Sequence, residues 1–372
     1  MKIPYPKSIL RVSWGVLPFL ALLLGASWLL QTNLMATEDY GTISARPAMS
    51  PNGQEIVFSS DVTGTTKLWI ATADGQSLRL LTSGVGIDDS PSWSPDGTTI
   101  AFSSRQNNVK DVWTIQRDGS NLRQLTSKTL NNFQPTWSTN GTRIAFVSDR
   151  SGTNDIWIMN ADGTNQVRLT QLSGEESEPS FSPLGDEVAF CETTNGSSFL
   201  MAVNIASGAT RSITSSGFND WHPSWSSSGI VFSSDRPPNA SGNPTIWVVQ
   251  SNGTGLHQFS NLAALHPSWT PNGDVLFTDE TNPGVAASGI SQVSSGGGSP
   301  HPLLPGSFNG DLNGDGIIDL KDIAIIQQAL NTVANQPYDA RDRNKDGKID
   351  GLDVRLLTTT CTFARCASTP PQ

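Results

Sequence analysis

The stretch Ser90-Pro-Ser-Trp-Ser-Pro-Asp-Gly97 is one copy of a motif that occurs six times along the chain at a fixed spacing. Its first proline recurs every 44 residues, and two residues later each copy carries a large apolar side chain. A glycine follows four residues further on, in three of the six copies directly after Pro-Asn or Pro-Asp, which is the chemistry of a tight turn with positive φ at glycine. Each copy therefore predicts a strand, a tight turn and a second strand. The six prolines are Pro47, Pro91, Pro135, Pro179, Pro223 and Pro267.

The rest of each repeat predicts two more strands. After the turn comes a short apolar run such as Ile100-Ala-Phe102, which is typical of a buried strand. A third strand centred on Trp113 leads to a turn at Asp118-Gly119, and a fourth ends at Leu125. Four strands per repeat and a period of about 40–50 residues are typical of propeller blades. A β-sandwich does not explain the strict period, and a β-helix repeat is much shorter, so we expect an all-β six-bladed β-propeller.

Residues 91–126 resemble the repeat of the TolB-like, or WD40-like, β-propeller family. They match its pattern P-x-W-S-P-D-G, then I-A-F, I-W, D-G and L-T, almost letter for letter. The resemblance covers about 46–304, and we assign 37–306 to the propeller domain. The segment 37–45 before the first repeat is too short to form a blade. If it adds an outer strand to blade six, it closes the ring.

Composition excludes one class of partner. The chain has 372 residues with 23 Lys plus Arg against 33 Asp plus Glu, a formal charge of −10. A protein that neutralises phosphates needs a basic face, so we expect no nucleic acid partner.

Residues 1–36 are expected to direct export. Lys2, Lys7 and Arg11 precede an apolar run at 12–30, and Ala36 offers a small residue for cleavage. We favour a cleaved signal peptide over a membrane anchor, because three Gly and Pro residues interrupt the apolar run. Either way the propeller lies outside the cytoplasm, secreted or held at the membrane. Buried Cys191 is expected in blade four, and Cys361 and Cys366 in the tail 361–372 could form a disulfide there.

Two Asp-rich loops near the C-terminus predict calcium sites. In each, oxygen side chains stand at loop positions 1, 3, 5, 9 and 12, a glycine makes the turn at position 6, and position 7 offers its carbonyl. An apolar-patterned helix follows each loop. The predicted ligands of the two Ca²⁺ ions are Asp311, Asn313, Asp315, Ile317, Asp319 and Asp322, then Asp342, Asn344, Asp346, Lys348, Asp350 and Asp353.

This duplicated loop–helix unit, at 307–360, resembles a type I dockerin, a small all-α, EF-hand-like module. The resemblance implies calcium binding and docking onto a cohesin-like domain of another protein. The residues before position 12, which help to choose the partner in that family, are Leu320-Lys321 and Gly351-Leu352. They differ from the Ser-Thr pair of cellulosomal members, so the resemblance does not imply a cellulosomal partner.

The residue before each repeat proline is the best candidate for ligand binding. These six positions should surround one mouth of the propeller channel, exposed, yet their chemistry differs from blade to blade. The loops with Asp149-Arg150 and Asp235-Arg236 are expected on the same face. Trp221 is a further candidate, for stacking on a sugar or peptide. The six positions are Arg46, Ser90, Gln134, Glu178, His222 and His266.

Glu178, His222 and His266 fall on consecutive blades, which is compatible with a transition metal or an acid–base pair, although we expect structural or ligand-contacting roles instead. There is no G-x-S-x-G or H-E-x-x-H motif. The sequence thus favours a non-catalytic binding protein whose propeller recognises protein or glycan and whose dockerin docks onto a partner. The alternative is a polysaccharide lyase or glycosyl hydrolase component, a role in polysaccharide catabolism that dockerin-bearing proteins often have.

Overall fold

The computed structural model describes the repeat region and two short strands of the C-terminal region. The described residues are 46–61, 65–75, 78–127, 130–215, 217–237, 243–280, 289–296, 299–304, 332–333 and 348–349. The export segment, the lead-in 37–45, Cys361, Cys366 and all the predicted calcium ligands except Lys348 lie outside them.

Six four-stranded antiparallel sheets follow one another along the chain, each made of four consecutive strands. Blade 1 has β1 (Ala48–Met49), β2 (Glu55–Ser60), β3 (Lys67–Thr72) and β4 (Leu78–Leu80); blade 2 has β5 (Ile87–Trp93), β6 (Thr99–Gln106), β7 (Val109–Gln116) and β8 (Arg123–Gln124); blade 3 has β9 (Asn132–Trp137), β10 (Arg143–Ser148), β11 (Asp155–Asn160) and β12 (Val167–Arg168). Blade 4 has β13 (Glu175–Phe181), β14 (Glu187–Thr194), β15 (Ser197–Asn204) and β16 (Thr210–Ser212); blade 5 has β17 (Asp220–Ser226), β18 (Gly229–Ser234), β19 (Thr245–Val249) and β20 (His257–Ser260); blade 6 has β21 (Ala264–Trp269), β22 (Val275–Asp279), β23 (Gly289–Val293) and β24 (His301–Leu304).

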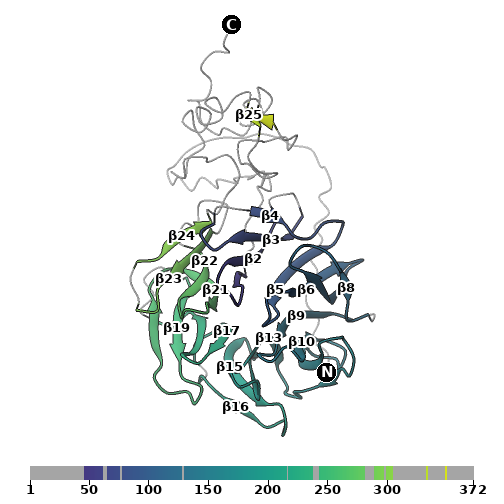
Figure 1. The fold of residues 1–372 in the computed structure, drawn as a ribbon. Helices are drawn as coiled ribbons and strands as arrows, with labels where there is room; N and C mark the ends of the chain where they lie inside the picture. The colour runs from purple at the N-terminus through teal and green to yellow at the C-terminus, as the bar shows by residue number, and fades with distance from the viewer. Residues whose placement is uncertain are drawn as a thin grey trace, which may run out of the picture. The chain divides into compact units, whose positions relative to one another are not determined.

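The first strand of each blade contacts the first strands of both neighbouring blades, and β1 contacts β21, so the six blades form a closed ring (Figure 1). The predicted six-bladed propeller is confirmed. The turn glycines after the first strands have the expected positive φ, for example 71° at Gly53 and 70° at Gly141. No bulkier residue adopts that backbone cheaply, which explains the glycine in every copy.

The core consists of six apolar clusters, one at each joint between neighbouring blades. Each second strand contributes a phenylalanine that is at most 1% exposed. At the joint of the last and first blades, Phe58 and Trp69 pack with Leu276, Ile290 and Leu304. Apolar packing therefore closes the ring at this joint within the described residues. The six phenylalanines are Phe58, Phe102, Phe146, Phe190, Phe232 and Phe277.

In the C-terminal region, β25 (Thr332–Val333) pairs antiparallel with β26 (Lys348–Ile349). Lys348, expected to offer its carbonyl to calcium, thus lies in a two-residue strand. The described part of the chain contains no helix long and apolar enough to cross a membrane.

Candidate functional site

The six residues before the repeat prolines share an unusual backbone conformation. Their φ angles lie between 41° and 59°, the left-handed region, although a residue before proline favours extended backbone. Each costs about 1–3 kcal/mol, and such strain gathers at functional sites. In five blades the register of strands one and two shifts at this residue, a β-bulge that re-aims its side chain. We call these six residues, Arg46, Ser90, Gln134, Glu178, His222 and His266, the channel ring.

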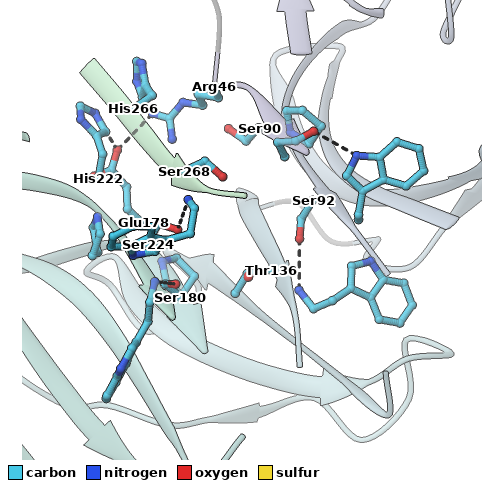
Figure 2. Close-up of a pocket in the computed structure, with 18 of the residues that line it drawn as sticks. Arg46, Ser90, Ser92, Thr136, Glu178, Ser180, His222, Ser224, His266 and Ser268 are labelled. Atoms are coloured by element: carbon cyan, nitrogen blue, oxygen red, sulfur yellow. Dashed lines mark hydrogen bonds and ion pairs between the residues drawn. The ribbon is translucent and has the colours of Figure 1, made fainter. Parts of the chain in front are cut away.

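The channel ring lines one cavity of about 380 Å³ at the centre of the propeller. The cavity extends from the ring along the repeat prolines and first-strand aromatics to Pro51 and Thr139 in the turns between strands one and two. None of the described residues that precede a ring residue in its own strand lines the cavity. The cavity therefore lies between the channel ring and these turns. The residues after the prolines also line it; five carry hydroxyls, Ser92, Thr136, Ser180, Ser224 and Ser268 (Figure 2).

An ion pair crosses the channel from one side to the other. Arg46 Nη2 lies 3.2 Å from Glu178 Oε1, and the two residues are 132 positions apart, which is three repeats. In a ring of six blades this separation places them on opposite sides. The two side chains are 31% and 11% exposed, so the pair is only partly open to solvent.

His222, the ring residue of the next blade, also lies beside Glu178. Its Nε2 is 3.2 Å from Glu178 Oε1, its Nδ1 lies 3.4 Å from the hydroxyl of Ser233, and its ring centroid is 4.0 Å from that of His266. Burial lowers the pKa of His222 to about 4 although Glu178 raises it. Burial, with the neighbouring His222 and Arg46, holds the pKa of His266 well below its ordinary value. Both imidazoles are therefore neutral at pH 7.

Glu178 itself stays ionised. Burial acts to raise its pKa, but His222, Arg46 and the backbone N–H of His222 together lower it below the usual range. That N–H donates to Glu178 Oε2 at 2.7 Å and Arg46 Nη2 donates to Oε1, so two donors converge on one carboxylate. A carboxylate so bonded is a fixed negative charge in the channel at neutral pH.

Neighbouring ring residues are also linked by side chain-to-backbone bonds. Gln134 Oε1 accepts the backbone N–H of Glu178 at 3.0 Å, just as Glu178 accepts that of His222 in the next blade. The expectation of exposed residues at a channel mouth was therefore wrong: Ser90 is 8% exposed, and the Glu178 and His222 side chains are 11% and 16% exposed. In five blades the bulge turns the ring side chain into the channel, where Glu178 bonds Arg46 and the backbone N–H of His222.

The metal hypothesis gains no support. Within the described residues, no group of three or more His, Cys, Asp or Glu side chains could hold a metal ion. Both oxygens of Glu178 accept bonds from protein donors, and Nδ1 of each channel histidine faces a hydroxyl, of Ser233 or Thr278.

Trp221 does not line the cavity; it packs, partly buried, against the apolar cluster between blades 4 and 5. Cys191 belongs to the same cluster, as predicted, and burial raises its thiol pKa to about 12.

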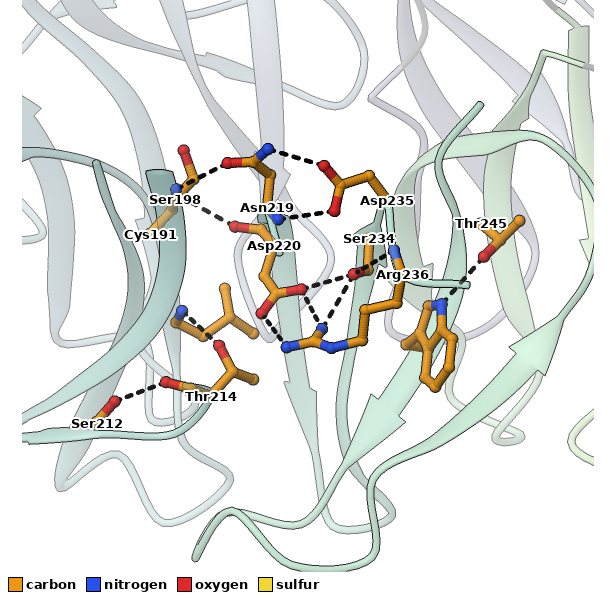
Figure 3. A network of polar contacts seen from close by, with 12 residues as sticks. Cys191, Ser198, Ser212, Thr214, Asn219, Asp220, Ser234, Asp235, Arg236 and Thr245 are labelled. Carbon is orange, nitrogen blue, oxygen red and sulfur yellow. Dashed lines mark hydrogen bonds and ion pairs between the residues drawn. The ribbon is translucent and has the colours of Figure 1, made fainter. Parts of the chain in front are cut away.

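The Asp-Arg loops expected on the ring face are structural. Arg236 is 6% exposed and directs both Nη atoms at the buried carboxylate of Asp220, while Asp235 bonds Asn219 (Figure 3). Asp149 bonds Asn131 in the same way. These contacts tie the first strand of a blade to the end of its second strand.

Sequence reasoning missed the hydroxyl row behind the channel ring. Ser92, Ser180 and Ser224 stand between the repeat proline and the aromatic residue of the motif, a position that indicates a role in packing. Each hydroxyl accepts the backbone N–H of a tryptophan in the next blade, at 3.0 to 3.3 Å. The small hydroxylated residue between a proline and an aromatic was the available signal.

Two families match the chain. The TolB beta propeller domain family matches residues 30–132 and 167–307. The Dockerin type I domain family matches residues 309–360; dockerins of this type bind calcium and dock onto cohesins, which implies a cohesin partner and an extracellular setting. A search of curated proteins finds no match.

Solved structures of low identity share the fold. A putative TolB from Agrobacterium tumefaciens is 19% identical, with a TM-score of 0.53, over 61% of this chain and 84% of that chain. TolB from Acinetobacter baumannii is 22% identical, TM-score 0.56, over 65% and 61%. An oligogalacturonate lyase in complex with manganese is 12% identical, TM-score 0.53, over 81% and 85%. With its six blades and these family matches, the chain belongs to the TolB β-propeller family and carries a C-terminal type I dockerin domain.

Proposed function

We propose that this protein is an exported, non-catalytic binding protein. Its propeller takes up part of a protein or glycan ligand in the central channel, and its dockerin carries it to a cohesin-bearing partner. One observation carries the proposal: the repeat position whose chemistry differs from blade to blade lines the 380 Å³ cavity, in strained backbone. Constant packing positions with a variable, strained lining are what a binding site on a repeat scaffold requires.

Binding is favoured over catalysis by the state of Glu178. Glycoside hydrolysis needs two carboxyl groups about 5–10 Å apart, and Glu178 is the only carboxylate that lines the cavity among the described residues. His222, Arg46 and the backbone N–H of His222 lower its pKa and hold it ionised, whereas a general acid needs a raised pKa. The alternative, a polysaccharide lyase or glycosyl hydrolase, is supported only by the similarity in fold to the oligogalacturonate lyase. It requires turnover of a polysaccharide that His222→Ala and His266→Ala abolish.

The channel can be tested by obstructing it where it opens. Thr139 lies at the turn end of the cavity and is exposed, so Thr139→Trp should narrow the channel without disturbing the core. Thr164→Trp, in the exposed turn between β11 and β12 of the same blade, is the matched control. We expect the full chain to bind members of an array of oligosaccharides and peptides, and only Thr139→Trp to weaken that binding. Equal binding by both variants would place recognition elsewhere.

The dockerin is tested through calcium. The two loops gather carboxylates that repel one another without a cation, so folding and docking of 309–360 should require Ca²⁺. We expect the full chain to bind a type I cohesin in calcium but not in chelator, and Asp315→Ala with Asp346→Ala to abolish binding. Asp118→Ala, in an exposed propeller turn, is the control for lost charge. Docking that persists in chelator would contradict the calcium assignment.

Export is tested at the N-terminus of the native protein. A cleaved signal peptide leaves a chain that starts near Thr37 and is recovered without detergent. A chain that begins at Met1 or Lys2 and stays with the membrane supports the anchor instead.

A further inference from the structure

The polar groups of the channel are unevenly divided between donors and acceptors. Glu178, its single carboxylate among described residues, already receives N–H groups from Arg46 and His222. The Gln134 side-chain oxygen receives the backbone N–H of Glu178. The strongest acceptors that line the cavity are thus engaged within the protein, and an added ligand meets few free acceptors there.

Donors remain. Within the described residues Arg46 forms one bond, through Nη2, so Nε and Nη1 of its guanidinium are left for a ligand. Arg46 is also the most exposed member of the ion pair, at 31% against 11% for Glu178. A guanidinium with a free edge matches the two oxygens of a carboxylate, which it binds through two parallel hydrogen bonds.

The hydroxyl row adds weaker donors along the cavity wall. Because the oxygens of Ser92, Ser180 and Ser224 each accept a backbone N–H from the next blade, their own hydrogens can turn toward a bound group. A ligand that reaches Arg46 from the turn side passes these hydroxyls. The channel wall and its inner end therefore both favour an acceptor-rich, negatively charged group.

We propose that the channel binds the carboxylate of a ligand, anchored by the free edge of the Arg46 guanidinium, and that Glu178 is an internal competitor for the same cation. The proposal rests on the proposed function of the channel and adds the chemistry of the group that it takes. Glu178 neutralises Arg46 when the channel is empty, which keeps a partly buried cation paired. It also repels an incoming carboxylate, so Glu178 weakens binding while Arg46 produces it.

The first test uses pairs of small probes that differ only in charge. An acetylated dipeptide with a free C-terminal carboxylate is compared with its amide, and glucuronate with glucose, by calorimetry on the full chain. We expect the charged member of at least one pair to bind at least about tenfold more tightly, because a hydrogen bond to a charged group contributes more than one to a neutral group. The pair that responds identifies a peptide or a uronate source. No preference for charge in either pair overturns the proposal.

The second test uses two variants that should act in opposite directions. Arg46→Met removes the anchor and should lower the affinity for the charged probe at least about tenfold. Glu178→Gln removes the competing charge, keeps an amide oxygen for His222, and should raise that affinity severalfold. The controls are Arg105→Met and Glu175→Gln, which make the same charge changes at exposed residues outside the cavity. A fall in affinity for Glu178→Gln equal to that for Arg46→Met would contradict competition.

The two proposals fail in different ways. If array ligands bind and Thr139→Trp blocks them, but neither Arg46→Met nor probe charge matters, the channel binds a ligand without a carboxylate anchor. If Thr139→Trp blocks nothing, the channel is not the binding site and both proposals are overturned.

Discussion

Two arginine–carboxylate pairs in this propeller differ in what surrounds them. Asp220 and Arg236 lie 16 residues apart in one blade; the carboxylate is fully buried, and Arg236 Nη1 and Nη2 each bond one of its oxygens. Ser234 donates to the same carboxylate at 2.7 Å, and the guanidinium lies 5.4 Å from the ring centroid of Phe218. Arg46 and Glu178 meet across the channel through one contact, and Arg46 is 31% exposed.

This difference in burial and in the number of contacts distinguishes an ion pair that stabilises the fold from one that can bind a ligand. In the Asp220 pair, both oxygens and both terminal nitrogens are used within one blade and both side chains are buried, so the pair is closed to a ligand. In the channel pair, the arginine keeps unused donors beside a cavity. Residues of the same type thus serve the fold in one place and are available for recognition in the other. Variants of the two arginines should separate these roles.

The largest effect is expected at Arg236. Arg236→Met leaves the Asp220 carboxylate buried without its cation, which typically costs about 3–5 kcal/mol of unfolding free energy. Burial already acts to raise the pKa of Asp220, so the unpaired acid would take up a proton. Denaturant unfolding followed by tryptophan fluorescence measures the loss. Arg105→Met, at an exposed position, should change stability by less than about 0.5 kcal/mol. A comparable small change for Arg236→Met would show that this pair is not a scaffold contact.

An intermediate effect is expected from pH. The folded-state pKa of His222, about 4, lies below its ordinary 6.5, so between these values the unfolded chain holds the proton and the folded chain does not. Stability should therefore fall as the pH drops from about 6.5 to 4, by about 3 kcal/mol for this residue. His266 acts in the same direction.

Unfolding measured at several pH values in this window checks the prediction. His222→Gln cannot titrate and should flatten the dependence, while His257→Gln, at an exposed position, is the control. A wild-type stability that is constant from pH 6.5 to 4 would mean that the channel histidines are protonated as easily in the folded chain as in the unfolded one.

The fold was readable from sequence because packing requires the same kind of residue at the same place in every blade. Proline, a large apolar residue and the turn glycine repeat every 44 residues, and strands, turns and ring follow from that period. Even the weak sixth repeat, with Ser291 in place of a third-strand aromatic, forms its strand, β23. Where the sequence pattern of a single strand is weak, apolar contacts with neighbouring strands stabilise that strand.

The site was only partly readable. The period placed the six ring residues together in one channel, but it could not show the left-handed backbone that turns them inward, since a residue before proline normally favours extended structure. Contacts such as Arg46 with Glu178 join residues three repeats apart, and no local pattern encodes them. Trp221 looked free because it breaks the period, yet it packs against the core.

The smallest effect on stability is expected at Arg46. A single ion-pair contact with one partly exposed partner contributes about 0–1 kcal/mol, so Arg46→Met should lower unfolding free energy by no more than about 1 kcal/mol, in contrast to Arg236→Met. Glu178 keeps the backbone N–H of His222 as a donor and is not left unpaired. A double-mutant cycle of Arg46→Met with Glu178→Gln measures the coupling between the two side chains directly. A coupling of several kcal/mol would make the cross-channel pair a structural clasp between opposite blades. A coupling below about 1 kcal/mol means that a ligand can take the arginine from Glu178 at little cost to the fold.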